Sequence, residues 1–130
     1  MFPRILIVED DPDTAQCFAK LLTMSGYYVR VATGFRSALS LADRECFDLL
    51  VCDIGLPDGL GLELMQMLSA KYGMRGIAIS GFGEPQIADA CMKAGFSAHI
   101  LKPTTFEHIL DVIQIHLLPP HMPAMTIAAL

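Results

Sequence analysis

Five short apolar runs recur along the chain, and each is followed by a turn and then by a longer segment with helical spacing. The runs are Ile5–Val8, Tyr28–Ala32, Leu49–Cys52, Gly76–Ile79 and Ala98–Leu101. In the segments after them, apolar residues recur three and four positions apart, which gives a helix one apolar face. Strands that alternate with helices predict βαβ units and therefore a parallel sheet.

The composition of the runs predicts the order of the strands in this sheet. Ile5–Val8, Leu49–Cys52 and Ile77–Ile79 are wholly apolar, as strands covered by helices on both faces must be. Tyr28–Val31 alternates between apolar and polar residues, and Ala98–Leu101 is mixed, so these two runs are expected at the edges. The resulting fold class is α/β, with a doubly wound five-stranded parallel sheet of order 2-1-3-4-5 in a single domain.

Residues at the ends of the helical segments support this interpretation. Asp11 followed by Pro12 predicts the start of the first helix, since Asp is a good N-cap and Pro suits the first helical position. Gly26 and Gly95 stand where the first and fourth helices should end. The segment Thr104–Glu107 has the pattern of a capping box, which predicts the start of the last helix.

Composition and charge limit the class of protein. The chain has 130 residues, 53% of them hydrophobic and 18% charged, which suits one folded domain. Lys and Arg number 9 and Asp and Glu 14, a net charge of −5, so we expect no direct contact with nucleic acid. We expect no membrane insertion, because no apolar run has the length of a membrane helix.

The cysteines and the last residues of the chain lead to two further expectations. The four cysteines, Cys17, Cys46, Cys52 and Cys91, lack CxxC spacing, which is typical of free thiols in a cytoplasmic protein. Residues 1–117 are expected to form the domain. Residues 118–130 contain three prolines and no charge, and we expect a flexible tail, with an interaction peptide as the alternative.

Acidic residues follow two neighbouring strands of the predicted sheet. Glu9 and Asp10 come directly after the first strand, and Asp53 comes after the third. Ligands of doubly wound sheets bind beyond the carboxyl ends of the strands, where the winding reverses, and that point lies between these two strands. Carboxylates brought together there repel one another, and a hard divalent cation removes the conflict. Asp53 is not expected to cap a helix, because Gly55, Pro57, Gly59 and Gly61 predict a loop after it.

These residues belong to a pattern that resembles the receiver domain of two-component response regulators, which has a flavodoxin-like fold. The resemblance covers roughly residues 4 to 117. Its matching stretches are Ile5–Asp11, Leu49–Gly61, Ala78–Gly81, Ala94–Phe96 and Leu101–Pro103. Each stretch alone is weak evidence, but together they stand in order at the predicted strand ends.

The resemblance implies a role for each residue at the strand ends. Asp53 is similar to the phosphoacceptor, a carboxylate that takes a phosphoryl group. Glu9 and Asp10, with Asp53 and the main-chain carbonyl of Gly55, are similar to the residues that hold Mg²⁺. Lys102 is similar to the lysine that pairs with a phosphoryl oxygen.

The resemblance also implies a conformational switch. Ser80 is similar to the switch hydroxyl, and the switch aromatic of many family members is replaced here by His99, which is polar. An exposed histidine with no role is the alternative interpretation of His99. His99 and the segment 80–83 are more similar to receivers at the end of hybrid sensor kinases than to those of transcription factors.

The function implied by the resemblance is phosphorelay signalling. A sensor histidine kinase or a histidine phosphotransfer protein would donate its phosphoryl group to Asp53. The receiver would catalyse its own phosphorylation and slow autodephosphorylation without being an enzyme in the usual sense. Phosphorylation would switch the surface made by the fourth helix, fifth strand and fifth helix. The sequence indicates no oligomeric state.

Three alternatives have different chemical requirements. A degenerate receiver would serve only as a docking module, although every residue that the chemistry requires is present. An Mg²⁺-dependent phosphohydrolase with an aspartate nucleophile would usually need an acid two residues after it, where this chain has Gly55. A flavodoxin-type protein would bind the FMN phosphate after the first strand, where Glu9, Asp10 and Asp11 would repel it.

Overall fold

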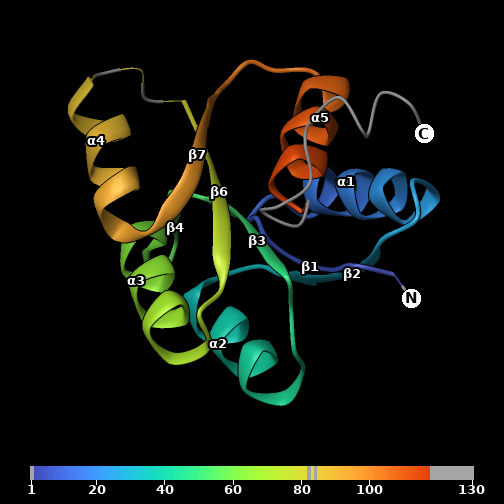
Figure 1. Ribbon diagram of the computed structural model, residues 1–130, viewed down its shortest axis with the longest axis horizontal. Coiled ribbons are helices and arrows are strands. Elements are labelled where there is room, and N and C mark those ends of the chain that lie inside the picture. Colours follow the sequence, from blue (N-terminus) through green and yellow to red (C-terminus); the bar gives the residue numbers. More distant parts are fainter. Residues whose placement is uncertain (1, 82, 84, 118–130) are drawn as a thin grey trace.

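The computed structural model describes residues 2–81, 83 and 85–117, and in this part of the chain strands and helices alternate as predicted (Figure 1). The strands of the main sheet are β1 (Arg4–Val8), β2 (Tyr28–Ala32), β3 (Leu49–Asp53), β6 (Arg75–Ser80) and β7 (Phe96–Leu101). The helices are α1 (Pro12–Met24), α2 (Phe35–Arg44), α3 (Gly61–Tyr72), α4 (Pro85–Ala94) and α5 (Phe106–His116). Two short strands, β4 (Gly55–Leu56) and β5 (Gly59–Leu60), form a hairpin between β3 and α3.

The main sheet is parallel throughout, with the spatial order β2-β1-β3-β6-β7. Counted among these five strands alone, this is the order 2-1-3-4-5. The predicted fold class, a doubly wound flavodoxin-like α/β sheet, is therefore confirmed. Helices α1 and α5 lie on one face of the sheet and α2, α3 and α4 on the other (Figure 1).

Each face of the sheet has its own hydrophobic core, because successive strand residues point to opposite faces. Ile5 and Ile7 of β1 pack in the layer of α1 and α5, with Leu22 and Ile109. Leu6 and Val8 pack in the layer of α2, α3 and α4; that layer also includes Ala38, Leu64 and Cys91. The four β1 residues are at most 2% exposed, which explains why the central runs are wholly apolar.

The helix ends agree with the sequence pattern, with one shift. Asp11 caps α1, and its carboxylate accepts a hydrogen bond from the backbone N–H of Thr14. Gly26 and Gly95 have φ angles of 99° and 112°, the left-handed region that glycine adopts without strain. The predicted capping box is wrong by one residue: Thr105 rather than its neighbour caps α5 and accepts from the N–H of His108.

The segment after Asp53 is more ordered than the predicted loop. Gly55 pairs with Leu60, and Leu56 pairs with Gly59, so the segment folds back as the β4–β5 hairpin. Helix α3 then begins at Gly61. A Cβ atom at Gly61 would lie 2.7 Å from the backbone oxygen of Asp53, so only glycine fits where this helix starts.

Two other expectations concern the ends of the chain and membranes. No helix among the described residues has the length and apolarity needed to cross a bilayer. The last described residue, Leu117, follows the end of α5. The predicted tail, residues 118–130, lies outside the described residues.

Candidate functional site

The structure brings together the three acidic residues that follow β1 and end β3. Glu9, Asp10 and Asp53 each offer a carboxylate oxygen, and these oxygens all lie within 4.8 Å of one another. The parallel register explains the convergence: Val8 of β1 pairs with Cys52 of β3, so both strands reach this edge of the sheet together. The site therefore lies at the point where the sheet reverses its winding.

The environment of Glu9 raises the pKa of its carboxyl group. Glu9 is only 8% exposed, and burial raises its pKa to about 7, with the hydrogen bond to Asp53 and the negative charge of Asp53 adding to the effect. Lys102 and the backbone N–H of Asp11 act in the opposite direction, and that N–H lies 3.4 Å from Glu9 Oε1. A second positive charge near Glu9 would lower this pKa and stabilise the ionised form of the carboxylate.

Asp53 is held on both of its carboxylate oxygens. The Nζ atom of Lys102 lies 2.9 Å from Asp53 Oδ2, and the backbone N–H of Gly55 donates to Oδ1 at 3.1 Å. Burial alone would lower the pKa of Lys102, but the hydrogen bond and charge of Asp53 outweigh it and raise that pKa. The lysine stays charged, and among the described residues it is the one cation that forms an ion pair with the cluster.

The donor chemistry of the cluster fits a hard divalent cation such as Mg²⁺. Such ions prefer carboxylate and carbonyl oxygens together with water. Lys102 pairs with only one of the three acids, Asp53, so a divalent cation would neutralise negative charge that the lysine leaves uncompensated. Gly55 is exposed, and its backbone N–H donates to Asp53 Oδ1 at 3.1 Å.

Ser80 and His99 form a contact that the sequence did not reveal. Ser80 Oγ lies 2.8 Å from His99 Nε2, across the neighbouring strands β6 and β7. Ser80 is only 1% exposed and His99 is half-buried. The backbone N–H of Lys102 donates to the carbonyl of Ser80 at 2.7 Å, which ties the lysine to the same strand end. The alternative interpretation placed His99 at an exposed position with no role; the exposed position is wrong, because His99 is half-buried.

Asp58 has a role that the sequence analysis did not assign. Its carboxylate accepts hydrogen bonds from the backbone N–H groups of Phe35, at 2.6 Å, and Arg36, at 3.1 Å, and so caps α2 from the β4–β5 hairpin. The residue before α2 is Gly34, which has no side chain to cap the helix. That missing local cap is the one sequence signal that a distant residue supplies it.

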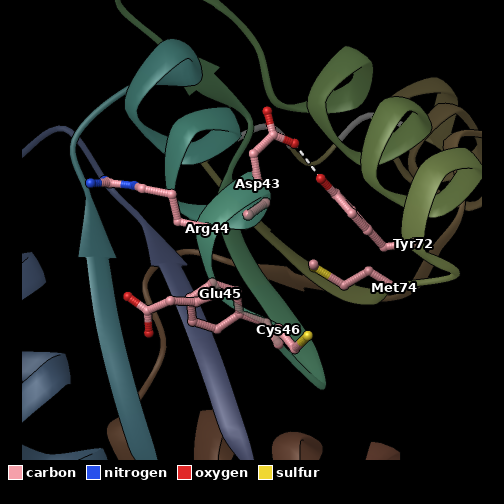
Figure 2. Close-up of a pocket in the computed structure, with 8 residues that line it drawn as sticks. Asp43, Arg44, Glu45, Cys46, Tyr72 and Met74 are labelled. Carbon is pink, nitrogen blue, oxygen red and sulfur yellow. Dashed lines mark hydrogen bonds between the residues drawn. The ribbon is translucent and has the colours of Figure 1, made fainter.

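A clear hollow in the described surface lies away from the acidic cluster. It has a volume of about 240 Å³ and is lined by the end of α2 and the residues that follow it, with Tyr72 and Met74 opposite. Figure 2 shows the hydroxyl of Tyr72 donating to the carboxylate of Asp43 at its rim. None of the predicted site residues lines this hollow. A much smaller hollow, of about 20 Å³, is lined by Glu9, Asp53 and Lys102, so the candidate site is located by its charged residues rather than by the size of its cavity.

Fold and site together define a class: a flavodoxin-like domain with an acidic pocket and a paired lysine at the winding switch. Comparison with known families agrees. The model of the response regulator receiver domain matches residues 5–114. The chain belongs to this family, and the alternative classes, a phosphohydrolase and a flavin-binding protein, are not favoured.

Several relatives resemble the chain at the level of sequence. It is 32% identical to an uncharacterized 14.6 kDa protein in the sodA1 3′ region of Leptolyngbya boryana, over 89% of this chain and 92% of that protein. It is 31% identical to the response regulator protein PilR of Pseudomonas aeruginosa over 85% of this chain. The match covers only 25% of PilR, so the chain corresponds to one part of that longer relative.

Solved structures have the same fold. A CheY-like response regulator receiver domain protein from Methanospirillum hungatei is 31% identical, with a TM-score of 0.84 over 90% of this chain and 94% of that one. The non-phosphorylated HemR receiver domain from Leptospira biflexa is 28% identical, with a TM-score of 0.84 over 92% and 99% of the two chains.

Proposed function

We propose that this chain accepts a phosphoryl group on Asp53 and thereby acts as a switch in a phosphorelay. The observation that carries the proposal is the meeting of Glu9, Asp10 and Asp53 within 4.8 Å, with Lys102 paired to Asp53. Membership of the receiver family supports the same assignment.

Glu9, Asp10 and Asp53, with the main-chain carbonyl of Gly55, would hold Mg²⁺. When bound, the ion would neutralise the carboxylates and stabilise the charge on the phosphoryl oxygens. The pKa of Glu9, raised to about 7, supports this assignment, because a bound cation would favour its ionised form.

The transfer step uses the carboxylate of Asp53 as a nucleophile. One of its oxygens attacks the phosphorus of a donor phosphohistidine, and an O–P bond forms while the N–P bond breaks. The electron pair of that bond stays on the imidazole, which takes a proton from solvent. Lys102 then exchanges its ion pair with Asp53 for one with a phosphoryl oxygen, since that oxygen carries the greater charge.

The same site would remove the phosphoryl group slowly. A water molecule attacks the phosphorus, the O–P bond to Asp53 breaks, and inorganic phosphate leaves while the carboxylate is restored. The receiver would therefore catalyse its own phosphorylation and its own slow autodephosphorylation.

The switch would run through Ser80. A phosphoryl group on Asp53 offers acceptor oxygens to the Ser80 hydroxyl, which lies against His99 in the present structure. Movement of this pair would change the ends of β6 and β7 and the face formed by α4, β7 and α5. The phosphoryl donor would be a sensor histidine kinase or a histidine phosphotransfer protein. The transfer would take place in the cytoplasm. The same step would apply to a receiver that stands alone and to one that belongs to a hybrid sensor kinase.

Mass spectrometry after incubation with acetyl phosphate and Mg²⁺ tests this proposal. We expect the mass of one phosphoryl group to appear on the wild-type chain, and no gain in Asp53→Asn or when the metal is chelated. An unmodified wild-type mass, or a modification that persists in Asp53→Asn, would exclude phosphotransfer to Asp53. The chain would then be better explained as a degenerate receiver that only docks other proteins.

A further inference from the structure

The β4–β5 hairpin is attached to α2 by a carboxylate. Asp58, in the turn between the two strands, accepts from the N–H groups of Phe35 and Arg36 at 2.6 and 3.1 Å. These bonds lower the pKa of Asp58, the one from Phe35 most. A negative charge at this place is also favoured by the dipole of the helix. The hairpin and the start of α2 are thus joined although 22 to 23 residues separate the bonded groups in the chain.

Two glycines show how closely the hairpin and α2 fit together. A Cβ atom at Gly34 would lie 2.7 Å from Asp58 Oδ1. A Cβ atom at Gly59 would lie 2.7 Å from a carbon of the Phe35 ring. Both distances are shorter than a carbon can approach without moving its neighbour, so the contact leaves no room for a side chain on either partner.

The other end of the same hairpin reaches the acidic cluster. The N–H of Gly55 donates to Asp53 Oδ1 at 3.1 Å, and the N–H of Gly61 donates to the carbonyl of Ile54 at 2.9 Å. Each strand of the hairpin has only two residues. A hairpin this short has little stability of its own, so its position depends on what it packs against.

We propose that Asp58 is a positioning residue for the metal site: by capping α2 it holds the hairpin, and with it the backbone of Gly55, beside Asp53. This inference rests on the proposed function, since it assumes that the cluster and Gly55 bind Mg²⁺. Asp58 itself touches neither the cation nor the phosphoryl group. It acts through the hairpin, as groups that orient metal ligands commonly do.

Two substitutions break the contact from opposite sides. Asp58→Ala removes the carboxylate. Gly34→Ala keeps the charge of Asp58 and places a methyl group against its Oδ1, and the backbone there is extended, with φ −163°, so alanine causes no backbone strain. Asp58→Asn keeps one acceptor oxygen for α2 and removes the charge. Comparing the three variants separates the effect of the charge from the effect of the position.

Asp43→Ala is a matched control. Asp43 is also an exposed aspartate that ties α2 to another element, through Lys71 Nζ at 2.9 Å and the hydroxyl of Tyr72 (Figure 2). It lies near the opposite end of α2, eight residues and about 12 Å along the helix from Phe35. Its loss removes one negative charge and one tie to α2 without touching the hairpin.

The test measures the dissociation constant for Mg²⁺ by isothermal titration calorimetry on the full chain. We expect Asp58→Ala and Gly34→Ala to weaken Mg²⁺ binding about tenfold, Asp58→Asn to fall between them and the wild type, and Asp43→Ala to bind as the wild type does. The rate of phosphorylation by acetyl phosphate at saturating Mg²⁺ should change far less than the affinity. Circular dichroism checks that each variant is folded.

Hydrogen exchange at the amide of Gly55, measured without metal, provides an independent result. We expect faster exchange in Asp58→Ala and Gly34→Ala than in the wild type, because the N–H···Oδ1 bond to Asp53 is no longer held.

Wild-type affinity and wild-type exchange in both Gly34→Ala and Asp58→Asn would overturn the positioning role and leave the proposed function standing. This pair decides the question even if Asp58→Ala does not fold. A wild-type chain that binds no Mg²⁺ would contradict the proposed function itself. In that case unchanged exchange at Gly55 would overturn the anchoring of the hairpin as well, and faster exchange would support that anchoring alone.

Discussion

The two ends of the central sheet both carry charged side chains, but the charges are arranged differently. At the amino end, the guanidinium of Arg4 lies 2.8 Å from Glu45 Oε1, and the backbone N–H of Arg4 donates to the carboxylate of Asp48. The carboxylate of Glu45 also pairs with Arg30, at 3.3 Å, and accepts from the hydroxyl of Tyr28. Each carboxylate at this end has its own donors.

At the carboxyl end, the acidic side chains outnumber the cations that pair with them. Glu9, Asp10 and Asp53 lie together, and Lys102 pairs with Asp53 alone. The pKa of Glu9 is raised to about 7, because burial and the neighbouring Asp53 disfavour its ionised form. Matched charges hold a fold together, and an uncompensated surplus of one sign marks a place prepared for an ion or for chemistry. The following predictions test this difference, beginning with the largest expected effect.

Replacing Lys102 with alanine removes the cation of the carboxyl end. We expect phosphorylation by acetyl phosphate at saturating Mg²⁺ to slow about 100-fold, because a positive charge that meets the phosphoryl oxygens in the transition state is lost. The rate of phosphorylation is measured from the intact mass of the chain over time and from the release of inorganic phosphate. Lys93→Ala, which breaks the exposed ion pair of α4 with Asp89, is the control and should leave the rate unchanged. Equal rates in the two variants would contradict the role of Lys102.

Replacing Glu9 with glutamine should change how stability depends on pH. The pKa of Glu9 in the folded protein is about 7, above its ordinary value of 4.5, so folding favours the protonated form. Glu9 therefore contributes stability that is fully present below about pH 4.5 and is lost as pH rises through 7.

Without Mg²⁺, the wild type should lose ~2 kcal/mol more stability than Glu9→Gln between pH 5 and pH 8. Urea unfolding at the two pH values measures this difference, and added Mg²⁺ should reduce it. Parallel pH profiles for the wild type and the variant would show that Glu9 is not perturbed as described.

Replacing Arg4 with alanine tests the amino end. Arg4 binds Glu45 and the carbonyl of Cys46, and its guanidinium lies 4.0 Å from the centre of the Tyr28 ring. We expect a loss of about 1.5 kcal/mol in the free energy of unfolding and an unchanged rate of phosphorylation. Arg75→Ala, at the same end of the sheet, removes an exposed arginine whose side chain has no described bond and should cost less. A slower reaction in Arg4→Ala would show that the two ends are coupled.

Replacing His99 with phenylalanine should have the smallest effect. The variant loses the 2.8 Å hydrogen bond to Ser80, so the hydroxyl no longer has to leave His99 to reach a phosphoryl group. We expect the phosphorylated form to be favoured by ~1 kcal/mol, seen as an up to about fivefold longer lifetime. His108→Phe, in the exposed face of α5, is the control. In the wild type, the ring resonances of His99 should shift on phosphorylation, and fixed resonances would contradict the exchange of partners.

The fold was predictable because it depends on features that are local in the sequence. Wholly apolar runs such as Leu49–Cys52 mark strands that are covered on both faces, and an alternating run such as Tyr28–Val31 marks an edge. Once the order of the strands is known, the residues that follow them must share one edge of the sheet, so the meeting of Glu9 and Asp53 follows from the chain itself.

The features that were missed depend on contacts between distant residues or on a choice between equivalent neighbours. Two adjacent threonines offer the same hydroxyl before α5, and only the backbone geometry selects Thr105 as the cap. The hydrogen bond between Ser80 and His99 depends on the register of β6 and β7. The cap that Asp58 supplies to α2 comes from a different element, and a glycine-rich segment gives no sign of the hairpin that carries it.

The separation of the core into two layers has a consequence for how such a chain can evolve. Val51 packs with α1 and α5, and the next residue, Cys52, packs with α2, α3 and α4. Substitutions in one layer share few neighbours with those in the other, and their effects on stability should therefore be nearly additive. Related sequences could therefore change the residues of one layer, and with them one surface of the domain, without compensating changes in the other layer. The sheet between the two layers would stay the same.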